Sequence, residues 1–207
     1  PIALTDEVAA LVAAFATMVA LHSGVGQVVD VNLIESMLQL MGPLVPLYGL
    51  LGETQQRLGA GIPYTVPRNT YLTGDGRWVA VSSSSESVAQ RVMSLIGLGD
   101  DDRFAGFSGR VAHRDEIDAR LAEWMAQRSA EEVLSEFEAA HAAVAPVYDM
   151  ADIAADAHFE ERGAIIDVDG TPMQEVVARL SATPGRVRWA GRALDADGDD
   201  IRAELGD

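Results

Sequence analysis

One stretch near the middle of the chain constrains the fold more than any other. Residues 59–85 read GAGIPYTVPRNTYLTGDGRWVAVSSSS. Pro63 and Pro67 exclude a helix from the first part, because proline lacks a backbone N–H group and restricts the preceding residue. Asp75 and Gly76 lie between two apolar runs, a pattern typical of a tight β-hairpin. The stretch therefore predicts a Gly/Pro-rich loop followed by two antiparallel strands.

The segment before this stretch is largely apolar and predicts one buried, mostly helical layer. Apolar residues recur at helical spacing over residues 7–22, with Thr5 or Asp6 as the expected N-cap. Residues 27–33 predict a strand, and residues 34–40 predict a second helix. This helix–strand–helix order suits the end of an α/β layer.

The segment after the hairpin predicts a small α+β domain. Ser83 and Glu86 have the spacing of a capping box, which marks the start of a helix. Ser129 and Glu132 have the same spacing and predict a second helix start. Further expected elements are helices at 114–127 and 150–155, an extended segment at 143–148, a hairpin at 169–170 and a terminal helix at 201–205.

The charge of the chain argues against nucleic acids and anionic membranes as partners. The net charge is −17, and all 15 basic residues are arginine. An acidic surface without a basic run repels phosphate-rich polymers and anionic lipids. The apolar run at residues 8–21 is too short to span a bilayer, which needs about 20 residues. We therefore expect neither a nucleic acid nor a membrane partner.

The absence of cysteine excludes disulfides, thiolate catalysis and cysteine metal sites, and it fits a cytoplasmic location. The four histidines are far apart, and none has the spacing of a metal-ligand pair. Acidic clusters at residues 100–102 and 195–200 lack the spacing of an EF-hand. The sequence therefore predicts no metal ion.

Asp6 is the single residue with the clearest chemical interest. It lies at the start of an apolar helix, where free N–H groups and the helix dipole favour negative charge. A carboxylate in this position can be a covalent nucleophile, because the same donors can stabilise a developing oxyanion. The alternative is that Asp6 is only a helix cap. The residue type alone leaves both interpretations open.

The small residues Gly59 and Gly61 form a turn that allows a ligand to approach the backbone closely. They lack the strand–GxGxxG–helix context of a dinucleotide-binding loop. The turn alone is equally consistent with an ordinary connection between two domains.

The chain as a whole resembles the family III CoA-transferases, the formyl-CoA transferase and CaiB/BaiF group. The matching segments are PIALTD, MVALHSGVGQVVDVNLIESML, RLGAGIPYTVPRNTYLTGDGRWVAVSSS, DDDRFAGFSGRVAHRDEIDARLAEWMAQRS, AVAPVYDMADIAADAHF and LSATP, in this order. The order and spacing of these segments together are more specific than any one of them.

The resemblance implies an α/β fold in which a Rossmann-like large domain joins a small α+β domain, with two subunits interlocked as a homodimer. Residues 1–58 would form the C-terminal part of the large domain. Residues 59–184 would form the small domain with its linker, and residues 185–207 would return to the large domain. The N-terminal half of the protein, which in the family supplies most CoA contacts, would lie outside this chain.

The resemblance also implies an activity, the transfer of CoA from an acyl-CoA thioester to a carboxylic acid. Asp6 occupies the position of the family's nucleophile, which forms an anhydride and then an aspartyl-CoA thioester. Gly59, Gly61 and Tyr64 fall where a loop of the family covers the active site, so they are the expected contacts of coenzyme A. This chain alone would then be an incomplete enzyme.

Two alternatives remain open from the sequence. A racemase or isomerase of the same family would use Asp6 as an acid/base partner of a histidine outside this chain. A truncated, non-catalytic dimerisation module would need no CoA site, and the chain has no basic cluster for the phosphates of CoA.

Overall fold

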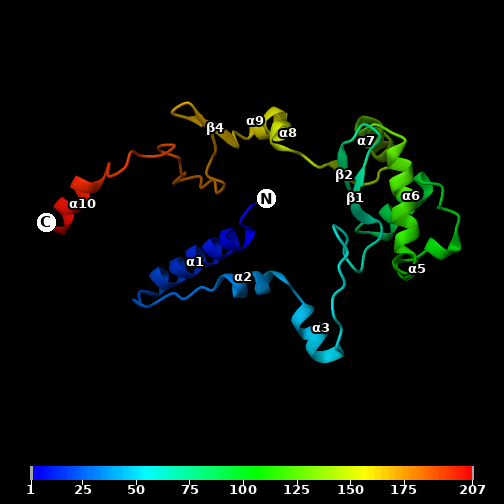
Figure 1. Ribbon diagram of the computed structural model, residues 1–207, viewed down its shortest axis with the longest axis horizontal. Helices are drawn as coiled ribbons and strands as arrows, with labels where there is room; N and C mark the ends of the chain where they lie inside the picture. Colours follow the sequence, from blue (N-terminus) through cyan, green and yellow to red (C-terminus); the bar gives the residue numbers. More distant parts are fainter. Residues whose placement is uncertain (1, 207) are drawn as a thin grey trace. The chain divides into compact units, whose positions relative to one another are not determined.

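The computed structural model describes residues 2–206 (Figure 1). It divides into two compact units, of which the first ends at Gly59 and the second begins at Ala60. Within the described residues, only the second unit contains β-strands. The chain is thus of mixed α/β type with small sheets.

The first unit consists of three helices, which are α1 (Leu4–Ser23), α2 (Leu33–Leu40) and α3 (Leu44–Leu51). α1 ends at Gly24, which adopts the left-handed conformation (φ 69°) and donates its N–H to the carbonyl oxygen of Leu21. Asn32 caps α2, because its Oδ1 accepts hydrogen bonds from the N–H groups of Ile34 (2.9 Å) and Glu35 (3.3 Å). α1 and α2 pack against each other.

The first unit differs from the sequence-based expectation at three places. α1 begins at Leu4 and its N-cap is Ala3, so the expectation that Thr5 or Asp6 is the cap is wrong. The strand expected at residues 27–33 is absent, because Leu33 begins α2 and no other described segment pairs with residues 27–32. α3 was not expected, but Pro46 lies in its first turn, where a missing N–H group costs no helical hydrogen bond.

α1 is also longer than the apolar run suggested. With 20 residues, it is long and apolar enough to cross a membrane by length and composition, so the expectation that this run is too short is wrong. α2 and α3 pass the same test together, with a bend of 77° between them. Length and composition do not distinguish a membrane span from a helix that another part of a protein covers.

The second unit is built on a three-stranded antiparallel sheet of β1 (Arg68–Leu72), β2 (Trp78–Ser82) and β3 (Val144–Pro146), in that order. The turn at Asp75 and Gly76 joins β1 to β2, which confirms the predicted hairpin. Gly76 has φ 81°, a conformation that favours glycine, so the sequence signal has a direct backbone cause.

The helical elements of this unit are α4 (Glu86–Leu95), η1 (Asp102–Phe104), α5 (Phe107–Ala112), α6 (Arg114–Ala126), α7 (Ala130–Ala139), α8 (Met150–Ala155), α9 (Ala157–Glu161) and α10 (Gly198–Leu205). α6 lies next to β1 (Figure 1), and α7 packs against β3. Ser129 and Glu132 form the predicted capping box at the start of α7. α4 is capped by Ser85 instead of Ser83, so that expectation is wrong by two residues. β4 (Ile165–Val168) and β5 (Thr171–Gln174) form the second predicted hairpin.

The hydrophobic core of the second unit lies between the sheet and α4, α6 and α7. Its buried side chains are Val66, Tyr71, Val79, Val81, Val92, Met93, Ile96, Phe104, Ile117, Leu121, Trp124, Met125, Val133 and Phe137. The rings of Trp124 and Phe137 meet edge to face, with centroids 5.8 Å apart. This core holds the start of α6 and the beginning of β1 in place. β1 directly follows the Gly/Pro-rich loop, and Arg114 at the start of α6 is hydrogen-bonded to it.

Candidate active site

Asp6 lies in the first turn of α1, together with Glu7. Its N–H group donates to the carbonyl oxygen of Ala3 (3.0 Å), while its side chain is exposed. Among residues 2–206, no donor is hydrogen-bonded to the Asp6 carboxylate. Since the carboxylate does not cap the helix, it is available for other chemistry beside the positive end of the helix dipole.

Gly59 closes the first unit in the left-handed conformation, with φ 61°. No atom lies within 4 Å of the position that a Cβ would take at Gly59, so the conformation is what favours glycine there.

Gly61 and Tyr64 belong to the second unit, and Gly61 directly precedes the turn that contains Tyr64. An isolated antiparallel bridge between Ile62 and Thr65 closes this turn, and Tyr64 lies inside it with 71% of its surface exposed. Thr65 and Val66, which follow, are buried. Of the four expected site residues, Tyr64 lies in this turn and Gly61 directly before it, while Asp6 and Gly59 belong to the other unit.

Arginines from two helices bind the backbone of this turn. Arg114, at the start of α6, donates from Nη2 to the carbonyl oxygens of Ile62 (2.7 Å) and Pro63 (3.2 Å). Arg110, in α5, donates from Nε to the carbonyl oxygen of Val66 (3.0 Å). The turn is therefore held on both sides of Tyr64.

Arg110 is fully buried, and its charge is balanced by Glu86 at the start of α4. Two hydrogen bonds of 2.7 and 2.8 Å join its guanidinium to the two carboxylate oxygens of Glu86. These bonds hold the pKa of Glu86 below its usual value, although desolvation opposes the shift. Arg110 is structural, because each of its three guanidinium nitrogens donates to a protein oxygen.

Sequence reasoning missed both arginines. Arg114 was expected only as the first residue of the helix at 114–127, and Arg110 was not singled out. Their partners, Glu86 and Ile62, are 24 and 52 residues away. No local pattern connects positions at such separations, so no signal in the sequence marks these contacts.

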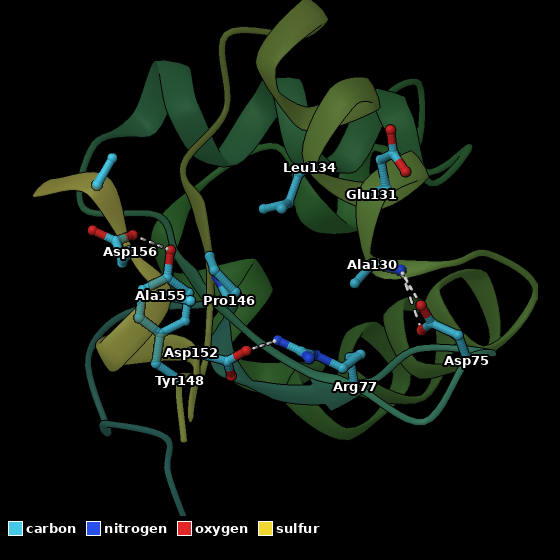
Figure 2. A pocket seen from close by; sticks show the side chains of 11 residues that line it. Asp75, Arg77, Ala130, Glu131, Leu134, Pro146, Tyr148, Asp152, Ala155 and Asp156 are labelled. Atoms are coloured by element: carbon cyan, nitrogen blue, oxygen red, sulfur yellow. Dashed lines mark hydrogen bonds and ion pairs between the residues drawn. The ribbon is translucent and has the colours of Figure 1, made fainter. Parts of the chain in front are cut away.

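A hollow of about 650 Å³ lies in the second unit beside β2, β3 and α8 (Figure 2). Its lining residues are Asp75, Arg77, Ala130, Glu131, Leu134, Pro146, Tyr148, Asp152, Ala155, Asp156 and Ala157. None of the expected site residues is among them. Figure 2 shows that several of the polar side chains are paired with one another.

The polar groups of this hollow are unsuited to the phosphates of coenzyme A. The Arg77 guanidinium is 2.8 Å from the Asp152 carboxylate, and the Tyr148 hydroxyl donates to Asp156 at 2.8 Å. The hydrogen bond from Tyr148 is the main cause of the lowered pKa of Asp156. Four carboxylates therefore face one guanidinium that is already paired, and an anion would be repelled.

Metal ligands are also not assembled in the part of the chain that the structure describes. No group of three or more histidine, aspartate or glutamate side chains in residues 2–206 could hold a metal ion.

Comparison with known proteins confirms the resemblance found in the sequence. A family model described as CoA-transferase family III matches residues 1–198. The succinyl-CoA–D-citramalate CoA-transferase of Chloroflexus aurantiacus is 35% identical over 99% of this chain and 54% of that protein. The alpha subunit of the succinyl-CoA–L-malate CoA-transferase of Chloroflexus aurantiacus is 31% identical over 98% of this chain and 50% of that protein.

Solved structures agree with this assignment. A CaiB/BaiF family protein from Brucella suis is 27% identical, with a TM-score of 0.80 over 99% of this chain and 56% of that one. A hypothetical protein from Mycobacterium tuberculosis shares the fold, with 20% identity and a TM-score of 0.70 over 89% of this chain and 50% of that one. The chain spans about half the length of these relatives, and it belongs to CoA-transferase family III.

Proposed function

We propose that the complete protein containing this chain is a CoA-transferase that moves CoA from an acyl-CoA thioester to a carboxylic acid, with Asp6 as the nucleophile. The observation that supports this most is the family match, together with an Asp6 carboxylate in the first turn of α1 that accepts no hydrogen bond within residues 2–206. A nucleophilic carboxylate must be free of a capping role, and the helix dipole favours its anionic form.

The proposed reaction consists of four acyl transfers, which alternate between thioester and anhydride and involve no hydrolysis. A carboxylate oxygen of Asp6 attacks the thioester carbonyl, and the CoA thiolate leaves a mixed anhydride behind. The thiolate then attacks the Asp6 carbonyl, which releases the donor acid and forms the aspartyl-CoA thioester. The acceptor carboxylate attacks this thioester and frees the thiolate. Finally the thiolate attacks the acceptor acyl group and regenerates the Asp6 carboxylate.

The names of the relatives suggest the first substrates to test. The two Chloroflexus enzymes are named for transfer from succinyl-CoA to a hydroxydicarboxylic acid, D-citramalate or L-malate. We therefore propose succinyl-CoA as donor and a small dicarboxylic acid as acceptor, without a metal ion. Gly59, Gly61 and Tyr64 are the proposed contacts of the CoA portion.

The proposal also requires protein outside this chain. Most large apolar side chains of α1, α2 and α3 are exposed, for example Leu11, Phe15 and Ile34. Soluble proteins rarely leave such a contiguous apolar surface uncovered. We propose that this first unit is the end of a Rossmann-like large domain, that the N-terminal half of the same polypeptide covers it, and that two subunits interlock as a homodimer in the cytoplasm.

Residues 27–31 support the same proposal. They were expected to form a strand, yet within residues 2–206 they have no strand partner. Val28 is 91% exposed, while Val29 and Val31 are half-buried, the alternation of a strand with one covered face. A strand in this position needs a neighbouring strand from outside this chain.

The test uses the complete protein, incubated with succinyl-CoA and analysed by mass spectrometry of its peptides. We expect a CoA adduct on Asp6 and a loss of turnover of at least about 10³-fold in Asp6→Ala. Glu7→Ala is the matched control, because Glu7 is the neighbouring exposed carboxylate in the same turn. Glu7→Ala should retain its turnover.

Three results would overturn the assignment. Full turnover in Asp6→Ala would exclude Asp6 as the nucleophile. Exchange of the α-proton of an acyl-CoA with deuterated water, without CoA transfer between acids, would identify a racemase or isomerase. A complete protein that binds no CoA would be a non-catalytic module.

A further inference from the structure

The turn that contains Tyr64 is more rigidly held than its sequence suggests. The bridge between Ile62 and Thr65 closes it, and Val66 is fully buried directly after it. Tyr64 is nevertheless 71% exposed. A large aromatic ring on a fixed backbone loses little conformational entropy when it binds a ligand, because few torsions remain to be ordered.

Arg114 holds the side of the turn that precedes Tyr64. Its Nη2 donates to two consecutive carbonyl oxygens, those of Ile62 at 2.7 Å and Pro63 at 3.2 Å. Hydrogen bonds from a charged donor are stronger than those between neutral groups. The last two peptide groups before Tyr64 are therefore fixed by one side chain.

The start of α6, where Arg114 lies, is itself fixed to the sheet. Asp118, one helical turn further along α6, accepts hydrogen bonds from the Tyr71 hydroxyl (2.6 Å) and from Asn69 Nδ2 (3.2 Å) in β1. Tyr71 is buried, and burial with the bond to Asp118 raises the pKa of its hydroxyl far above the usual value. Tyr71 thus keeps its proton and remains a hydrogen-bond donor. The two hydrogen bonds to Asp118 hold the start of α6, where the backbone of Arg114 lies, next to β1.

A second anchor lies on the other side of the turn. Arg110, buried and paired with Glu86, donates to the carbonyl oxygen of Val66 at 3.0 Å. The N–H group of Ser83 donates to the carbonyl oxygen of Pro67 at 3.2 Å. Because Arg110 also supports the core, Arg114 is the one of the two arginines whose removal isolates the effect on the turn.

From this arrangement we infer that Arg114 is a positioning residue for substrate binding, which fixes the Ile62 and Pro63 carbonyls so that Tyr64 is presented to the acyl-CoA. The inference rests on the proposed function, since it takes Tyr64 as a contact of the CoA portion. A preordered turn lowers the entropic cost of binding, so the loss of Arg114 weakens binding and leaves the chemical step intact.

The experiment measures the Kd of succinyl-CoA and the kinetics of the complete protein in Arg114→Ala, Arg114→Lys and Arg120→Ala. Arg120 is the matched control, because it lies in α6 and donates to the carbonyl oxygen of Ile96 (3.2 Å), away from the turn. We expect Arg114→Ala to raise Kd and KM by about 5- to 30-fold with kcat changed by less than roughly 2-fold. Arg114→Lys should recover part of the affinity, since an ammonium can donate to the same carbonyls.

Two further measurements separate positioning from general destabilisation. Amide exchange at residues 62–66 should accelerate in Arg114→Ala and stay unchanged in Arg120→Ala. In a double-mutant cycle, Arg114→Ala should add little to the loss of affinity caused by Tyr64→Ala, because both remove the same contact.

The inference is overturned if Arg114→Ala binds succinyl-CoA as tightly as Arg120→Ala does, if amide exchange in the turn is unchanged, or if the two losses of affinity are additive. These results are distinguishable from a failure of the proposed function. Full turnover in Asp6→Ala would exclude Asp6 as the nucleophile, but it would not change the expected effect of Arg114→Ala on the affinity for succinyl-CoA. A complete protein without affinity for CoA overturns both.

Discussion

The two units of this chain are both rich in apolar residues, but only one of them buries these residues. In the second unit, side chains such as Leu121, Met125 and Phe137 are fully buried between a sheet and helices. In the first unit, the buried residues within the described part are Ala9 and Ser36. The second unit has two layers that cover each other, and the first has one.

The difference shows that a segment rich in apolar residues does not by itself form a hydrophobic core. A helix with an apolar surface gains stability only when another layer removes that surface from water. α1, α2 and α3 are as apolar as core helices, yet side chains such as Leu50 remain 82% exposed. The first unit therefore gains far less stability from the burial of its own side chains than the second does.

The largest expected effect concerns the two units expressed separately. Residues 60–207 should unfold cooperatively in urea, because this unit contains its own core. Residues 1–59 should show no cooperative transition and should associate through their apolar surfaces. Near-ultraviolet circular dichroism and sedimentation measure both properties, and a cooperative, monomeric first unit would contradict the comparison.

A pair of leucine substitutions sharpens the comparison within one chain. Leu121→Ala, in the core, should lower the free energy of unfolding by about 2–5 kcal/mol. Leu11→Ala, at a position 72% exposed in α1, should change it by roughly 0.5 kcal/mol or less.

The same pair in the complete protein tests the proposed covering of α1. If the N-terminal half covers Leu11, the cost of Leu11→Ala should approach that of Leu121→Ala in urea denaturation. An equally small cost in both proteins would mean that this face of α1 is exposed to solvent.

The smallest expected effect is a pH dependence confined to the second unit. Arg110 lowers the folded-state pKa of Glu86, so this pair stabilises the fold above the unfolded-state pKa of about 4.5. The contribution disappears as the pH falls through the lowered pKa. Because Glu86 is half-exposed, we expect a change of roughly 1 kcal/mol or less. Glu86→Gln should weaken the decrease of the free energy of unfolding at acid pH, measured by urea denaturation at several pH values. The same decrease in Glu86→Gln as in the unsubstituted protein would contradict this.

Local features of the fold were predictable from the sequence, and non-local ones were not. The hairpin at Asp75 and Gly76 follows from the left-handed conformation that Gly76 adopts, and the capping box at Ser129 from hydrogen bonds within one turn. The cap of α4 was placed at Ser83 instead of Ser85, because four consecutive serines give equivalent local signals.

The candidate site was predictable to a smaller extent. Its local chemistry singled out Asp6 at a helix start, and the family resemblance singled out Tyr64. Nothing in the sequence indicated that Arg114 binds the carbonyl oxygens of Ile62 and Pro63, since a backbone carbonyl has no residue signature. The expected CoA contacts and the proposed nucleophile therefore remain predictions.

The sequence by itself determined the family, the acidic charge and the elements that arise from contacts a few residues apart. Only the tertiary structure decided that Arg110 is buried against Glu86, that Arg114 fixes the turn of Tyr64, and that the first unit lacks a covering layer. The physical reason is the separation along the chain between the residues that make each contact. Caps and turns are made by neighbours along the chain, whereas burial and side chain–backbone contacts depend on which distant segments the folded core brings together.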